Sequence, residues 1–131
     1  MLKKIKRFQR LATLRKKDIS KEILSSNLLE NEIMKNKNLI TQIDAIMESG
    51  KVKAEEKLIS AGYFKNNTQL LSTLQNQKNI AHHRQQYLIS EKKVIQSKII
   101  TNNIKKIKAE EKTSEYQKSH REDLDNKNYG L

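Results

Sequence analysis

The sequence predicts an all-α fold, an antiparallel two-helix coiled-coil hairpin, because the residues that interrupt helices are few and confined. No proline occurs among the 131 residues, and the only glycines are Gly50, Gly62 and Gly130. Proline costs about 3 kcal/mol inside a helix and glycine about 1 kcal/mol. Two long helices joined once are therefore favoured. A hydrophobic fraction of 35% beside 32% charged residues suits a narrow apolar seam better than a multilayered core.

The first arm of the hairpin is predicted over about residues 2–48. Its apolar residues recur at the three-, four- and seven-residue steps typical of a helix. They are Ile5, Phe8, Ala12, Ile19, Ile23, Leu24, Leu28 and Ile33. Ile40, Ile43 and Met47 resume the spacing in a rotated frame, which predicts a stutter in the heptads. Gly50 then favours a helix stop, since glycine tolerates the left-handed conformation that closes a helix.

A broad bend is predicted over about residues 49–67, where Asn66, Asn67 and Thr68 resemble the start of the next helix. The second arm covers about residues 68–125. Its apolar residues recur mainly at four- and seven-residue steps. They are Leu70, Leu74, Ala81, Leu88, Ile95, Ile99, Ile100, Ile104 and Ile107. Apolar positions thin out after Ile107, so a frayed tail is expected over residues 126–131.

The length predicts a single domain, residues 1–131, and the charges at its two ends favour antiparallel pairing. Residues 1–17 hold eight bases and no acid, whereas residues 110–125 hold six acids and three bases. An antiparallel hairpin places these stretches side by side. Each solvated pair contributes only tenths of a kcal/mol, but a systematic mismatch would argue against this register.

The composition argues against several classes of chemistry. Without cysteine there is no disulfide, thiolate nucleophile or sulfur ligand. Two helices with one seam offer almost no dry pocket, so we expect no enzyme activity, catalytic residue or cofactor. His82 and His83 are adjacent and point to different sides of a helix, so no metal site is expected. No apolar run approaches the roughly 20 residues of a membrane span.

Two features of the sequence suggest partner binding. The basic start could attract nucleic acid, a membrane surface or an acidic protein groove, and it also has the composition of a transit peptide. The shifted apolar frame and the return of the chain argue against a basic zipper, and sparse aromatics argue against single-strand stacking, so nucleic acid is disfavoured. Tyr63 and Phe64 lie at the bend, where they either plug the hairpin end or anchor a partner.

Three segments resemble the YscO and FliJ proteins of type III secretion and flagellar export. The first is the opening Met-Leu-Lys-Lys-Ile-Lys-Arg together with the following Phe-Gln-Arg-Leu-Ala-Thr-Leu-Arg. The others are Ile-Ala-His-His-Arg-Gln-Gln-Tyr from Ile80 and the charged Ser-His-Arg-Glu-Asp-Leu-Asp from Ser119. The resemblance spans nearly the whole chain, although degenerate coiled-coil patterns carry it. The opening residues tilt it toward the injectisome, and a flagellar system stays open.

The resemblance implies a monomeric stalk that links a hexameric export ATPase to the cytoplasmic domain of a membrane export-gate protein. Such a stalk is cytoplasmic, peripheral to the inner membrane, and can escort export chaperones. Its paired termini would enter the ATPase ring, and its bend would face the gate. The implied ATPase contacts are Lys3, Lys4, Arg7, Arg10, Arg15, Glu122 and Asp123. The implied gate contacts are Tyr63, Phe64, Leu70 and Leu74.

Two alternatives from other classes remain at this point. A basic coiled-coil protein could bind duplex nucleic acid without sequence preference, with an affinity that falls steeply with salt. A structural coiled coil could instead self-associate through the same seam and form a stable dimer or a higher oligomer.

Overall fold

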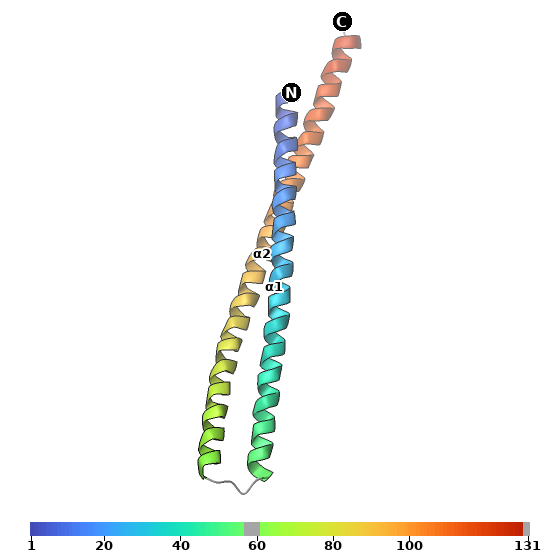
Figure 1. Cartoon of the computed structure of the whole chain (residues 1–131). Coiled ribbons are helices and arrows are strands. Elements are labelled where there is room, and N and C mark those ends of the chain that lie inside the picture. The colour runs from blue at the N-terminus through green and yellow to red at the C-terminus, as the bar shows by residue number, and fades with distance from the viewer. Residues whose placement is uncertain (57–60, 130–131) are drawn as a thin grey trace. The chain divides into compact units, whose positions relative to one another are not determined.

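The computed structural model describes the backbone of residues 1–56 and 61–129 and the side chains of residues 1–50 and 65–128. Helix α1 covers Leu2–Glu56, and α2 covers Ala61–Tyr129 (Figure 1). The two helices pack against each other, and the described residues contain no strand, so the all-α helical hairpin is confirmed. Over these residues, neither helix has a stretch apolar enough to cross a membrane.

The chain divides into two compact units, each of which pairs a part of α1 with a part of α2. The terminal unit consists of Met1–Ser26 and Lys93–Leu131, and the central unit is Asn27–Lys92. In the terminal unit, Phe8 stacks on Tyr116. In the central unit, Asp44 pairs with Lys78. Within each unit the partners of successive α1 residues come earlier along α2, which is the antiparallel arrangement that the sequence predicts.

The side chains that the two helices share follow one alternation of three- and four-residue steps. In α1 the buried or half-buried positions of this repeat are Ile5, Phe8, Ala12, Arg15, Ile19, Glu22, Ser26, Leu29, Ile33, Asn36, Ile40, Ile43, Met47 and Gly50. In α2 they are Asn67, Leu71, Leu74, Lys78, Ala81, Gln85, Leu88, Lys92, Ile95, Ile99, Asn102, Lys106, Ala109, Thr113, Tyr116 and His120. We call these positions the seam. Several of its members are polar.

The stutter predicted near the middle of α1 is wrong. The repeat passes without a break through Glu22, Ser26 and Leu29, and Leu28 is 58% exposed. The prediction of a stutter followed the apolar residues along the sequence. In the structure the three- and four-residue repeat continues unchanged, and polar residues occupy some of its positions. Other residues assigned to the seam by their apolar character are exposed for the same reason. They are Ile23, Leu24, Leu70, Ile100, Ile104 and Ile107.

The helix limits also differ from those predicted. Helix α1 continues beyond residue 48 to Glu56, and α2 begins at Ala61 instead of near residue 68. The residues between 51 and 56 are strong helix formers except for one valine, so nothing in them ends α1. At the other end, α2 runs through the predicted frayed tail to Tyr129. The structure does not describe residues 57–60 and 130–131.

Gly50 lies inside α1 and does not end it. A methyl group built at its Cα would meet Leu71 Cδ2 at 3.6 Å and Asn67 Oδ1 at 3.7 Å, which are ordinary van der Waals separations. We therefore expect Gly50→Ala to raise the free energy of unfolding by about 0.5–1 kcal/mol, because alanine loses less backbone entropy in a helix. Urea denaturation followed by circular dichroism measures the change. A loss of stability would instead support the helix stop predicted from the sequence, since alanine is strained in a left-handed conformation.

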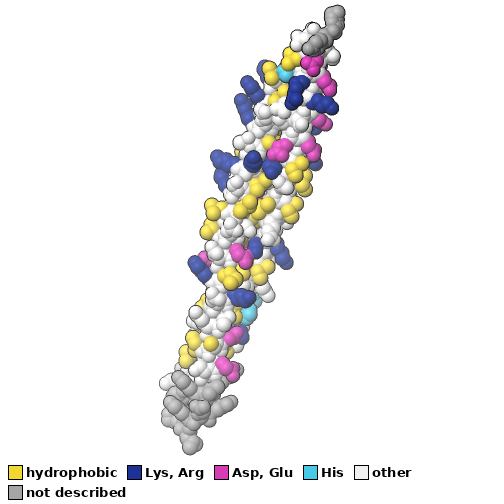
Figure 2. Space-filling model, turned by 90° about the vertical axis from the view of Figure 1, so that its right-hand side faces the viewer, with side chains coloured by type: hydrophobic (Ala, Val, Ile, Leu, Met, Phe, Trp, Pro, Cys, Tyr) yellow, Lys and Arg dark blue, Asp and Glu magenta, His cyan; other side chains and the backbone are white. Residues whose placement is uncertain are grey.

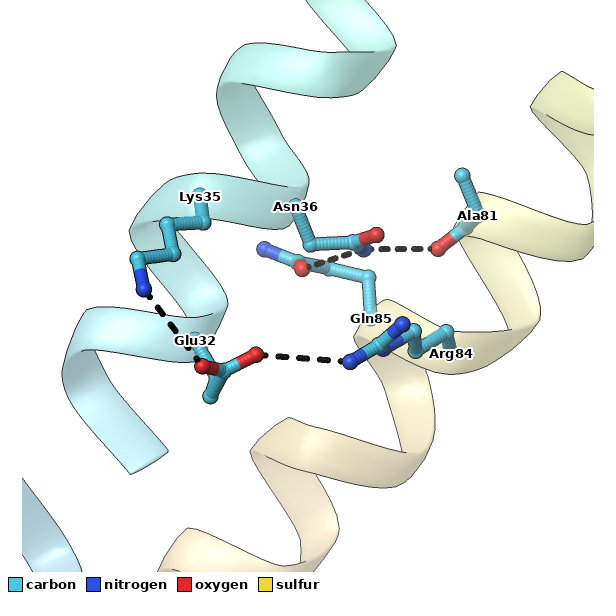
Figure 3. A network of polar contacts seen from close by, with 6 residues as sticks. All are labelled: Glu32, Lys35, Asn36, Ala81, Arg84 and Gln85. Atoms are coloured by element: carbon cyan, nitrogen blue, oxygen red, sulfur yellow. Dashed lines mark hydrogen bonds and ion pairs between the residues drawn. The ribbon is translucent and has the colours of Figure 1, made fainter. Parts of the chain in front are cut away.

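One buried asparagine ties the helices together in the central unit (Figure 3). Asn36 is 5% exposed, and its Nδ2 donates to Ala81 O at 2.8 Å and to Gln85 Oε1 at 2.7 Å. Gln85 Nε2 in turn donates to Ile33 O at 3.3 Å. Beside this network, Arg84 pairs with Glu32 at 3.3 Å. Because a buried amide must find its partners, such a residue favours one register over its neighbours.

Candidate partner-binding surfaces

Most of the positive charge lies in the terminal unit. This unit holds 18 of the 27 Lys and Arg residues and 8 of the 15 Asp and Glu residues, which gives it a formal net charge of +10. On the face drawn in Figure 2, Lys and Arg side chains gather over this unit, with Asp and Glu among them. The central unit carries only the remaining +2. A surface that recognises acidic groups is therefore to be sought first in the terminal unit.

Arg15, one of the predicted ATPase contacts, lies in the seam of the terminal unit. Its Nη1 donates to Asn102 Oδ1 at 3.2 Å and lies 3.9 Å from Asp18 Oδ2. Asn102 Nδ2 donates onward to Glu22 Oε1 at 2.7 Å. These bonds join α1 to α2 and hold the guanidinium, so Arg15 has a role within the chain that spacing alone did not indicate. Glu22 Oε2 is buried without a hydrogen-bond partner.

Lys4 is also engaged within the terminal unit. The rings of Phe8 and Tyr116 stack with centroids 5.6 Å apart and planes 16° from parallel. Lys4 Nζ lies 5.4 Å from the Tyr116 centroid, within the range of a cation–π contact. Tyr116 therefore joins the outer end of α2 to the first turns of α1. Sequence reasoning gave Tyr116 no role, because the ring on which it stacks is 108 positions away in the sequence.

The other predicted basic contacts are on the surface. Lys3, Arg7 and Arg10 are exposed. Lys3, Arg10 and the exposed Lys17 are seven residues apart, which places them in one column on the side of α1 opposite the seam. We call these three residues the outer column. All three side chains are exposed and open to a partner.

The acidic contacts predicted on α2 lie near the start of α1. Glu122 and Asp123 are exposed. Asp123 lines one hollow together with Met1, His120 and Leu124. Basic and acidic candidates thus share the terminal unit, as antiparallel pairing predicts. Among its described residues, the ion pairs are local to each helix and do not join the two candidate sets.

A groove between α1 and α2 in the terminal unit is basic, and sequence reasoning missed it. Its lining consists of Phe8, Leu11, Arg15, Lys105, Lys108, Ala109 and Lys112. We call it the basic groove. Lys98, Lys105 and Lys112 are seven residues apart and exposed beside the seam of α2. The seven-residue spacing of these lysines is visible in the sequence. It indicates a basic edge of the groove only when the position of the seam on α2 is known.

The structure describes the side chains of two predicted gate contacts, Leu70 and Leu74, and these two differ in exposure. Leu74 is 8% exposed in the seam of the central unit, so the prediction of a surface role for it is wrong. Its position in the seam buries it, and Leu71 at the preceding seam position is half-buried. Leu70 is exposed and remains a surface residue. The side chains of Tyr63 and Phe64 lie outside the described residues.

The described surfaces can bind charge and pack against helices. His82 and His83 are both exposed. In the part of the chain that the structure describes, no group of three or more His, Asp or Glu side chains is placed to hold a metal ion. The arrangements that stand out are the outer column, the mixed end near Met1 and Asp123, and the basic groove. Each offers charge to a partner.

Comparison with models of protein families, with curated proteins and with solved structures found no match to this chain.

Proposed function

We propose that this chain is a non-enzymatic stalk of a type III export apparatus, linking a hexameric export ATPase to the cytoplasmic domain of an export-gate protein. The sequence resemblance to YscO and FliJ proteins suggests this role. The observation that supports it best is the terminal unit, where the basic start of α1 and the acidic end of α2 lie together with a net charge of +10. A narrow, basic pair of helices suits an acidic ring lumen.

The residues proposed for the ATPase contact are exposed and take no part in the packing contacts described above. The ATPase contact is assigned to Lys3, Arg7 and Arg10, with Glu122 and Asp123 beside them. Lys4 and Arg15 instead support the packing of the unit. The gate contact is assigned to Tyr63, Phe64 and Leu70, which belong to the central unit. In this role the chain works at the cytoplasmic side of the inner membrane, and export chaperones are further candidate partners.

The ATPase contact can be tested by charge reversal of the exposed bases. We expect Lys3→Glu with Arg7→Glu and Arg10→Glu to weaken binding to the purified export ATPase of the same host by about tenfold or more, and to remove any stimulation of ATP hydrolysis. Calorimetry and a hydrolysis assay measure the two effects. The three residues make none of the seam contacts, so the variant should keep its helical circular dichroism.

A matched control uses Lys37, Lys65 and Lys93, which are exposed and lie away from the chain ends. Reversing them changes the net charge by the same amount. If both variants lose ATPase binding equally, the attraction is diffuse and the assigned contact is wrong. If wild-type protein does not bind the ATPase at all, the stalk proposal fails.

Duplex nucleic acid is the second candidate partner, and the charge concentrated in the terminal unit favours it too. Binding of that kind uses phosphates, so its affinity should fall by nearly one power of ten per contact for each tenfold rise in salt. Tight duplex binding at physiological salt, together with no recovery of an ATPase from the host, would favour this function over the stalk.

A further inference from the structure

The basic groove of the terminal unit has a lining of unusual character. Four of its seven lining residues are cations and none is an acid. Arg15 is held by Asn102 and Asp18, and Lys112 lies 3.3 Å from Glu115 one turn along α2. Over the described residues, Lys105 and Lys108 form no ion pair. Two of the four cations therefore remain fully available to an external carboxylate.

The floor of the groove is apolar. Leu11 is half-buried, and Ala109 is a buried small residue at the seam, so less side-chain volume separates the helices there. Phe8 completes the floor, and the stacked Tyr116 already occupies one face of its ring. An apolar strip bordered by cations is complementary to a surface that is apolar in its centre and acidic at its edges.

The cations also have the spacing of a helix. Lys98, Lys105 and Lys112 recur every seven residues, which is about 10.5 Å along α2. A second helix lying along the groove repeats its own side chains at the same interval, so it can present a carboxylate to each lysine in turn. Nucleic acid would use the lysines but not the apolar floor.

We propose that the basic groove is the docking site for an acidic amphipathic helix of another protein. The apolar side chains of that helix lie on Phe8, Leu11 and Ala109, and its flanking carboxylates pair with Lys105 and Lys108. A second copy of this chain does not fit, because each copy carries a formal net charge of +12 and each terminal unit +10. The site is separate from the outer column and goes beyond the proposed function, since it requires no ATPase.

The test compares two variants with the same change in charge. The groove variant carries Lys105→Glu, Lys108→Glu and Lys112→Glu, and the control carries Lys3→Glu, Arg10→Glu and Lys17→Glu in the outer column. The probe is a fluorescent synthetic helix with leucines on one face and glutamates beside them. A second peptide has the same composition in an order that scatters the leucines. Anisotropy titrations at physiological salt give the affinities of full-length protein for each.

We expect wild-type protein and the control variant to bind the amphipathic peptide alike, and the groove variant to bind it about tenfold or more weakly. The scattered peptide should bind wild-type protein weakly. Equal losses in both variants, or equal affinity for both peptides, would overturn the proposal. Tighter binding of a DNA duplex that only the groove variant loses would also overturn it. Circular dichroism checks folding, and if helicity is lost the same lysines are changed to Gln. Failure of the ATPase test leaves these outcomes unaffected.

Discussion

Replacing Asn36 by aspartate should lower the free energy of unfolding by about 3 kcal/mol at neutral pH. Asn36 Nδ2 donates to two acceptors, Ala81 O and Gln85 Oε1. An ionised carboxylate at this buried position turns the donor into an acceptor and adds an unpaired charge. A flip of the Gln85 amide would supply a donor only by giving up the bond to Ile33 O. Urea denaturation of the two proteins measures the difference.

This loss of stability should depend on pH, with a defined sign. Burial and two facing acceptors raise the pKa of the new carboxyl group above the value of about 3.9 in the unfolded chain. The folded state then binds a proton more tightly than the unfolded state. The deficit is therefore full above the folded pKa and shrinks as the pH falls toward about 3.9. The protonated group can again donate a hydrogen bond.

Asn38→Asp is the matched control, because Asn38 is exposed two residues away in the same helix. The chemical change is identical, and we expect an effect within about 0.5 kcal/mol at neutral pH. The two variants share every other side chain, so effects of pH elsewhere in the chain cancel in the comparison. Only the difference between the variants reports on the seam. A difference near zero across the pH range would mean that Asn36 does not face its two acceptors in solution.

The fold class could be predicted because it depends on where helices are interrupted. With proline absent and glycine rare, the sequence leaves room for two long helices and one connection. The antiparallel direction followed from the charges at the two ends. Gly50 was misjudged because glycine at a helix end and glycine inside a helix look alike in sequence. A long helix that packs against a partner can continue through one glycine. At Gly50 the nearest residues of the partner helix are Leu71 and Asn67.

The exact seam could not be predicted because this chain has more apolar residues than seam positions. Leu28 and Leu29 are neighbours of the same type, and only the repeat of both helices together selects Leu29. Conversely, the polar residues of the seam were not predicted to lie between the helices. Arg15 and Asn102 look like surface residues until the register places them opposite each other, 87 residues apart in sequence. Pairing across the hairpin thus carries information that neither helix has alone.

The candidate surfaces, like the seam, could be predicted only in part. The basic start and acidic end were visible in the sequence as runs of charge. The basic groove was not, since its lysines lie on α2 and its apolar floor comes mostly from α1. A lysine every seven residues is common on exposed helices and acquires a meaning only beside an apolar strip. Sites built by one helix can be read from the sequence, whereas sites built between helices need the register.

The polar seam leaves stability dependent on few residues. Among the described side chains, the buried apolar residues are Ile5, Ile43, Leu74, Ala81, Leu88 and Ala109. Ile43 is 4% exposed in the central unit. We expect Ile43→Ala to lower the free energy of unfolding by about 2–4 kcal/mol, the usual cost of lost apolar burial plus a residual cavity. Thermal and urea unfolding followed by circular dichroism measure it.

Ile46→Ala is the control for Ile43→Ala, because it removes the same atoms one turn along α1 from a side chain that is 51% exposed. We expect it to cost less than about 1 kcal/mol. Domains of this size have total stabilities of only about 5–15 kcal/mol, so the loss at Ile43 should be visible as a large fall in the unfolding midpoint. Equal effects at the two positions would contradict the seam, since only a different rotation of α1 could bury Ile46 as deeply as Ile43.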